Sequence, residues 1–247
     1  MTAADVVFPG DDAALRGYCA TPAGGARAPA IVLIPDVRGV TDFYRDVARR
    51  FAEAGFLTLA VDLYSREGAP DLPDMDAVFR WIRALPDRRV LGDLAAATRY
   101  LGARADARAG AIGIAGFCLG GQYAFMAACT VPGLAACVSW YGMLRYAETD
   151  VVKPESPLAM APRLACPYLG LFGAEDALIP RADVEELRTT LARTGRPFEI
   201  VAYPGAGHAF MNETRPEAYR PEAATDSWRR ALSFLRTHLA GGAATAR

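Results

Sequence analysis

The sequence predicts an α/β fold in which a mostly parallel central sheet carries helices on both faces. Short apolar segments alternate with longer amphipathic segments along most of the 247 residues, and this order is typical of a parallel sheet with crossover helices. A chain of this length, 52% hydrophobic, can bury a substantial core. We therefore expect one domain spanning residues 1–247, in which the small, polar tail 241–247 frays.

The individual elements follow from periodicity and from the residues that bound each segment. The expected strands are apolar runs at 15–20, 30–34, 56–61, 111–115, 135–140, 168–172 and 197–203. The expected helices are at 42–54, which Gly55 closes, and at 75–84, 91–101, 119–129, 182–194 and 223–239. Two longer irregular segments, 64–74 and 143–162, are expected to form the rim of a pocket.

A cysteine lies between an expected strand and the helix that follows it. Residues 116–121 read Gly-Phe-Cys-Leu-Gly-Gly, which is the pattern of a nucleophile elbow with cysteine in place of serine. Glycines two positions before and after Cys118 allow the chain to turn sharply there. The first N–H groups of the helix would face the sulfur and favour its thiolate form. The segment therefore predicts a nucleophile.

A nucleophile of this kind needs a base and an acid that orients the base, in the chain order nucleophile, acid, histidine. His208 is one of two histidines and lies in a Gly- and Pro-containing loop after the strand 197–203. The acid is expected in the turn after the strand 168–172, where Asp176 is preferred and Glu175 is the alternative. The other histidine, His238, is in the last turn of the C-terminal helix, where a structural role is sufficient.

The chain resembles the dienelactone hydrolase family, a branch of the α/β-hydrolase superfamily that uses a cysteine nucleophile. The resemblance covers nearly the whole chain and depends on several short motifs in the same order. These are Ile-Pro-Asp-Val-Arg-Gly at 34–39, Val-Asp-Leu-Tyr at 61–64, Gly-Asp-Leu at 92–94, residues 116–121, Tyr-Gly at 141–142, Gly-Ala-Glu-Asp at 173–176 and Gly-His-Ala-Phe at 207–210. It implies an α/β-hydrolase fold and cleavage of a small ester or lactone.

The resemblance also implies a role for each of several residues. Cys118 would attack the carbonyl to form a thioester, His208 would transfer the proton, and Asp176 would hold the imidazole. The backbone N–H groups of Leu119 and Val37 would form the oxyanion hole.

Three further side chains are implied near the same site. Asp36, where the family commonly has glutamate, would hold the proton on the resting thiol, since a nearby carboxylate raises a thiol pKa. Tyr141 resembles the family's tyrosine beside the site, although ordinary strand packing also explains an aromatic residue there. Arg38 and Asn212 are the other candidate contacts to substrate.

The substrate is expected to differ from dienelactone itself. Family members that act on dienelactone carry an arginine four residues after the histidine, and this chain has Asn212 there. Arg215 is the nearest arginine downstream, and Arg38, Arg80 and Arg83 are alternatives. We therefore expect the same reaction on a different or broader set of esters.

Composition restricts the partners. A formal net charge of −1 gives no basic surface for nucleic acid or for anionic membranes. The first residues lack a charged leader followed by an apolar core, so a cytoplasmic location is expected. Five cysteines, mostly in apolar segments, fit reduced thiols better than disulfides. We expect a small-molecule substrate, no metal or other cofactor, and a monomer or weak homo-oligomer.

One alternative belongs to another functional class. The same scaffold would suit a thiol-redox or ligand-binding protein, in which Cys118 reacts with an oxidant or a covalent ligand and ester turnover is negligible.

Overall fold

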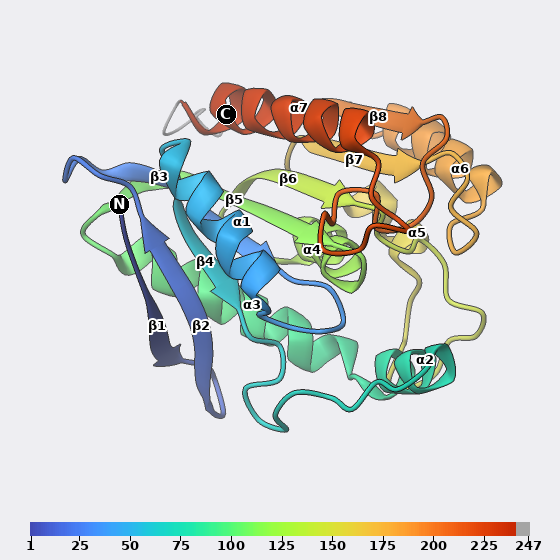
Figure 1. Ribbon diagram of the computed structural model, residues 1–247, viewed down its shortest axis with the longest axis horizontal. Helices are drawn as coiled ribbons and strands as arrows, with labels where there is room; N and C mark the ends of the chain where they lie inside the picture. The colour runs from blue at the N-terminus through green and yellow to red at the C-terminus, as the bar shows by residue number, and fades with distance from the viewer. Residues whose placement is uncertain (241–247) are drawn as a thin grey trace.

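The computed structural model describes residues 1–240 and contains an eight-stranded sheet in the order β1-β2-β4-β3-β5-β6-β7-β8 (Figure 1). The strands are β1 Thr2–Pro9, β2 Ala14–Thr21, β3 Ala28–Ile34, β4 Leu57–Val61, β5 Ala107–Phe117, β6 Leu134–Trp140, β7 Tyr168–Gly173 and β8 Phe198–Tyr203. The pairs β1–β2 and β2–β4 are antiparallel, and the remaining pairs are parallel. The mostly parallel sheet is therefore confirmed.

Every expected strand is present, and one strand was not expected. β1 lies at the edge of the sheet and pairs only with β2 along its length. Most of its side chains are exposed, and Phe8 is its one fully buried residue. An edge strand with so little apolar burial has no alternating pattern strong enough to predict it. The expected polar tail 241–247 lies outside the described residues.

The expected helices are present and differ from expectation only near their ends, whereas two short helices, α5 and η1, were not expected. They are α1 Asp42–Glu53, α2 Met75–Ala84, α3 Asp87–Ala103, α4 Leu119–Thr130, α5 Pro157–Met160, α6 Arg181–Ala192 and α7 Pro221–Leu239, with a short 3₁₀ helix η1 at Ala161–Arg163. α3 begins four residues earlier than predicted, directly after Pro86. The segment expected to be irregular at 143–162 contains α5 and part of η1.

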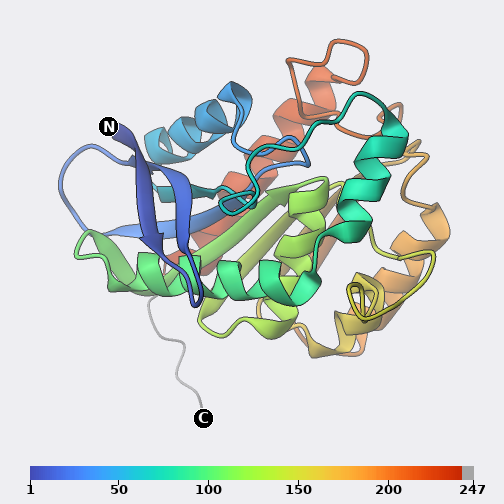
Figure 2. The same cartoon turned by 90° about the horizontal axis from the view of Figure 1, so that it is seen from below.

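The helices form a layer on each face of the sheet (Figures 1 and 2). α1 and α7 lie together on one face, where Phe51 packs on Trp228 at 4.5 Å between ring centroids. α3 and α4 cover the other face, as seen from below in Figure 2. Strands buried on both faces are uniformly apolar, and all five residues of β4 are buried accordingly.

The sheet topology determines where a site can form. From β3 the chain crosses to β4 on one side, and from β5 it crosses to β6 on the other. β3 and β5 are therefore neighbours at a switch point, where the loops after the strands separate and leave a crevice. Ile34 is paired with Gly116, so the loop after β3 and the turn after β5 leave the sheet side by side.

Across residues 1–240, no helix combines the length and the apolar character that crossing a bilayer requires.

Candidate active site

Cys118 occupies a strained turn between β5 and α4. Its backbone has φ 55° and ψ −117°, a conformation that residues with a side chain rarely adopt. Its N–H donates to the carbonyl of Trp140 at 3.0 Å, and its carbonyl accepts from the N–H of Gln122 at 3.0 Å. These two bonds hold the turn between the end of β6 and the first turn of α4. The strained backbone places Cys118 at the rim of the sheet, where its side chain is partly exposed.

The two flanking glycines are required by close backbone contacts. A Cβ on Gly116 would lie 2.0 Å from the carbonyl oxygen of Gly120. A Cβ on Gly120 would lie 2.1 Å from the carbonyl oxygen of Ile34 in β3. Neither gap can hold a methyl group, because the contacting atoms belong to the backbone. The glycines therefore allow the elbow to close against β3.

His208 and Asp176 come together from two separate loops. Nδ1 of His208 lies 2.7 Å from Oδ2 of Asp176, and the Asp176 side chain is fully buried. The alternative acid, Glu175, contacts the same loop elsewhere, since its Oε1 accepts from the N–H of Gly205 at 2.8 Å. Asp176 is thus placed to orient the imidazole, and Glu175 ties down the loop that carries it.

His208 and Cys118 line the same cavity. Nε2 is buried and has no hydrogen-bond partner among residues 1–240. Burial by itself would lower the pKa of His208, but the charge of a Cys118 thiolate and the hydrogen bond to Asp176 outweigh it and raise the pKa to about 10. A carboxylate and a thiolate on either side of one imidazole stabilise its protonated form. The arrangement favours the protonated imidazole of His208.

This electrostatic coupling predicts a titration that NMR can measure. We expect the ring of His208 to titrate with a pKa of about 10, and to titrate at clearly lower pH in Cys118→Ala, because the charge that holds its proton is gone. His238 is an internal control, since partial burial lowers its pKa and the substitution is remote from it. An unchanged His208 titration in Cys118→Ala would show that the two groups are not coupled.

The loop after β3 brings one backbone amide and a carboxylate to the site, and the start of α4 brings a second amide. Val37 and Leu119 line the same cavity as Cys118, and Leu119 is the first residue of α4, whose amide has no partner within the helix. The hydroxyl of Tyr64 donates to the carbonyl of Val37 at 2.8 Å and fixes this loop. Both residues whose amides are expected to form the oxyanion hole therefore line the cavity.

Asp36 contacts its own loop in this structure. Oδ1 accepts from the N–H of Arg38 at 2.8 Å, and Oδ2 lies 3.8 Å from the Arg38 guanidinium. Burial raises the pKa of Asp36, and the hydrogen bond from the Arg38 N–H opposes that effect. Its pairing with the resting Cys118 thiol stays a prediction.

Tyr141 packs directly against the histidine. Its ring lies 5.1 Å from that of His208 and 5.3 Å from that of Phe210, in edge-on arrangements. Its hydroxyl is buried without a hydrogen-bond partner in the described part of the chain, and burial raises the pKa of Tyr141 well above its ordinary value. Among the residues described, the hydroxyl is therefore an unpaired donor close to His208, and its contact with a substrate stays a prediction.

Cys118 and His208 line one small cavity of about 50 Å³, and Asp36, Tyr141 and Asp176 are not among its lining residues. Its lining is mostly apolar, with two arginines, and consists of Val37, Arg38, Met75, Val78, Phe79, Ile82, Cys118, Leu119, Met143, Leu178, His208 and Arg215. Residues 75, 78, 79 and 82 form one face of α2, so this helix is one wall of the cavity. The sequence predicted α2 as a helix, but the role of its apolar face was missed, although its i, i+3, i+4, i+7 spacing is visible in the sequence.

Two of the arginines that the sequence suggested, Arg38 and Arg215, line the cavity. Asn212 does not line the cavity, because its Oδ1 accepts from the N–H and the hydroxyl of Thr214 in a local turn. Arg215, three residues further on, lines it together with Arg38. Arg83 instead contacts Asp150 at 3.2 Å on the surface. Substrate contact at Asn212 stays a prediction, and this cavity offers Arg215 in its place.

The remaining candidates have structural surroundings. His238 packs on Phe234 at 4.4 Å in the last turn of α7. The four cysteines other than Cys118 are buried free thiols. Within residues 1–240, no three His, Cys, Asp or Glu side chains are grouped to hold a metal ion, and the expected absence of a metal stays a prediction.

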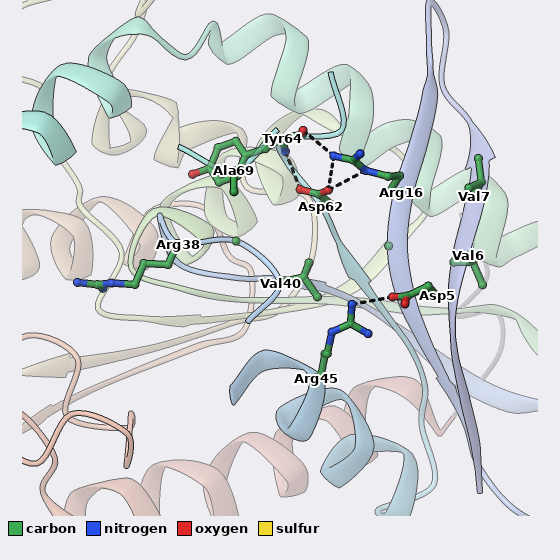
Figure 3. A pocket seen from close by; sticks show the side chains of 12 residues that line it. Asp5, Val6, Val7, Arg16, Arg38, Val40, Arg45, Asp62, Tyr64 and Ala69 are labelled. Atoms are coloured by element: carbon green, nitrogen blue, oxygen red, sulfur yellow. Dashed lines mark hydrogen bonds and ion pairs between the residues drawn. The ribbon is translucent and has the colours of Figure 1, made fainter. Parts of the chain in front are cut away.

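A second and larger pocket, of about 510 Å³, lies between β1, β2 and the loops after β3 and β4 (Figure 3). Two ion pairs lie in its wall: Arg16 contacts Asp62 at 3.0 Å, and Arg45 contacts Asp5 at 2.8 Å. The Arg38 side chain points away from these pairs. Neither Cys118 nor His208 lines this pocket. The larger volume therefore does not identify the candidate active site.

Comparisons with known proteins agree with the geometry. The model of the dienelactone hydrolase family matches residues 15–239. A Bradyrhizobium protein named as a probable 2-oxo-3-(5-oxofuran-2-ylidene)propanoate lactonase is 39% identical over 91% of this chain and 90% of its own. A Methylorubrum extorquens protein provisionally named carboxymethylenebutenolidase is 34% identical over 96% of this chain and 82% of its own.

A solved structure gives the same result for the fold. A protein from Klebsiella pneumoniae, provisionally named a dienelactone hydrolase, superimposes with a TM-score of 0.89 at 35% identity, over 95% of this chain and 98% of its own. Together with the strand order and the helices on both faces, this likeness confirms the predicted α/β-hydrolase fold.

Proposed function

Because this chain belongs to the dienelactone hydrolase family, we propose that it hydrolyses a small carboxylic ester or lactone through a thioester on Cys118. His208 transfers the proton and Asp176 orients His208. The observation that carries the proposal is the 2.7 Å contact between His208 and Asp176, in a site whose cavity wall also includes Cys118. A nucleophile, a base and an orienting acid in this arrangement support acyl transfer.

The first half-reaction forms the thioester. The Cys118 thiolate attacks the carbonyl carbon, and the developing oxyanion accepts hydrogen bonds from the N–H groups of Leu119 and Val37. The His208 imidazolium then gives its proton to the departing alkoxide as the carbon–oxygen bond breaks. For a lactone, the alkoxide and the acyl group stay in one molecule, which the ring opening leaves attached to sulfur.

The second half-reaction hydrolyses the thioester, and loss of the sulfur charge prepares it. Once Cys118 is acylated it carries no negative charge, so the pKa of His208 falls and the imidazole becomes a base. It takes a proton from water as the water oxygen attacks the thioester carbonyl. Cleavage of the carbon–sulfur bond releases the acid and restores the thiolate beside protonated His208.

The cavity supports a substrate that carries an anionic group. Arg38 and Arg215 line it beside an otherwise apolar wall, and arginine recognises carboxylates by paired hydrogen bonds. The Bradyrhizobium relative is named for a lactone that is itself a propanoate. We therefore propose a lactone or ester with a carboxylate, which departs from the expectation based on Asn212 alone.

Substrate selection gives the test of this proposal. We expect the protein to hydrolyse carboxylated lactones better than neutral ones of the same size. Arg38→Ala and Arg215→Ala should each raise KM for the carboxylated lactone about tenfold, which corresponds to one lost charged contact, and leave KM for the neutral lactone unchanged. Arg80→Ala is the control, because Arg80 is exposed and does not line the cavity. A preference for the neutral lactone, or equal effects on both, would contradict the assignment.

A further inference from the structure

A buried polar cluster lies behind the active site, and the chemistry above does not use it. Nζ of Lys153 is 2.7 Å from Oδ1 of Asp87, and the two side chains are 2% and 1% exposed. The hydroxyls of Tyr123 and Tyr146 donate to the two oxygens of Asp87 at 2.9 Å and 3.0 Å. The side-chain amide of Gln122 donates to the Tyr146 hydroxyl at 2.7 Å. We refer to these five residues as the buried network.

Stability alone is a weak explanation for such a network. Removing two charges from water costs free energy that their attraction often fails to recover, and apolar replacements of similar size are frequently as stable. Retained buried ion pairs are better explained where they fix one particular arrangement of the chain. What the network connects is therefore the relevant observation.

The network joins three separate segments. Asp87 is the first residue of α3 and follows α2 by three positions, and its N–H also donates to the carbonyl of Val152 at 3.1 Å. Tyr146 and Lys153 belong to the segment between β6 and α5. Gln122 lies in the first turn of α4, where its own N–H bonds to the carbonyl of Cys118.

Two of these segments, and α2 just before the third, contribute to the cavity wall. α2 contributes Val78, Phe79 and Ile82, the segment after β6 contributes Met143, and the start of α4 follows Cys118. Figure 1 shows α2 beyond the ends of the strands, beside the segment between β6 and α5. α2 packs through Val78 and Ile82 on its buried face, and the network holds the chain three residues beyond its C-terminal end.

We propose that the Asp87–Lys153 ion pair is a positioning element, which holds α2 and the segment after β6 at a fixed separation from Cys118 and so limits the size of group that reaches the sulfur. The inference rests on the proposed function only in assigning turnover to Cys118. Loss of the pair lets this wall move outward, so bulky groups enter more easily and small ligands lose apolar contacts.

The experiment measures access to Cys118 without relying on turnover. Intact mass spectrometry follows alkylation by iodoacetamide and by the bulkier N-phenylmaleimide, with peptide mapping to Cys118, at a temperature where circular dichroism shows every variant folded. The variants are Lys153→Met, which leaves Asp87 unpaired, and Asp87→Asn with Lys153→Met, which leaves no buried charge. Tyr146→Phe keeps the ion pair and removes the link to Gln122. Glu155→Gln is the control, since it breaks an exposed pair with Arg163 on the same segment.

We expect the ratio of the alkylation rate by N-phenylmaleimide to that by iodoacetamide to rise about tenfold in the two Lys153 variants, because small shifts of the cavity wall have large effects on reactivity. The ratio should rise less in Tyr146→Phe. Glu155→Gln should keep the wild-type ratio. For the substrate, KM should rise while kcat changes little. If Lys153→Met fails to fold, the double variant and Tyr146→Phe carry the test.

Two results would overturn the inference. One is a wild-type reagent ratio in the folded double variant. The other is a wild-type reagent ratio in folded Lys153→Met despite a lower melting temperature, which would show that the pair only stabilises the fold. If the ratio shifts as expected but the wild-type protein turns over no ester, the proposed function fails and the positioning role stands.

Discussion

Cys118→Ala should lower kcat/KM for a p-nitrophenyl ester by roughly ten-thousandfold or more, because removing the nucleophile removes the covalent route entirely. The elbow should still fold, since the turn depends on Gly116 and Gly120 and on backbone hydrogen bonds. Steady-state kinetics with the purified variant measure the effect.

The matched control is a thiol at the other end of the same helix. Cys129 is buried near the end of α4, and Cys129→Ala should keep the wild-type kcat/KM. Equal losses in the two variants would indicate damage to α4 and not loss of a nucleophile. Substantial turnover by Cys118→Ala would show that another group attacks the ester.

Asp176→Asn should lower kcat on the order of a thousandfold, with little change in KM. The Asp176 carboxylate accepts from His208 at 2.7 Å. An asparagine amide cannot stabilise the imidazolium, and it can hold the ring in the wrong tautomer. Single-turnover kinetics should show that acylation and hydrolysis both slow down, because His208 acts in each.

Glu175→Gln separates the two carboxylates of this turn. Glutamine keeps an oxygen that can accept from Gly205, as Glu175 does at 2.8 Å, so we expect nearly wild-type activity. If Glu175→Gln were the more damaging change, Glu175 would be the orienting acid and the assignment of Asp176 would be wrong.

Local patterns predicted the elements that hold the site. The strand before Cys118 and the helix after it are encoded by neighbouring residues. The flanking glycines indicate that backbone segments pack closely there, with no room for a side chain. His208 was found because the chain has only two histidines and one follows a strand. Such features depend on a few adjacent residues.

Contacts between distant segments were much harder to predict. Arg215 lines the cavity and Asn212 does not, because the side-chain oxygen of Asn212 accepts hydrogen bonds within a local turn. No spacing rule predicts that local turn. The partnership of Asp87 with Lys153, 66 residues apart, depends on how α3 and the segment after β6 pack. β1 was missed because an edge strand buries too little apolar surface to leave a pattern.

The central claim is that substrate carbon is transiently bonded to the sulfur of Cys118, and acid-quenched intact mass spectrometry during p-nitrophenyl acetate turnover tests it most directly. We predict a fraction of protein heavier by one acetyl group, with the label on the peptide containing Cys118, released by neutral hydroxylamine and absent from Cys118→Ala. Rapid turnover with no adduct, or an adduct on another residue, would contradict the account. Negligible turnover with ready oxidation of Cys118 by peroxide would favour the thiol-redox alternative.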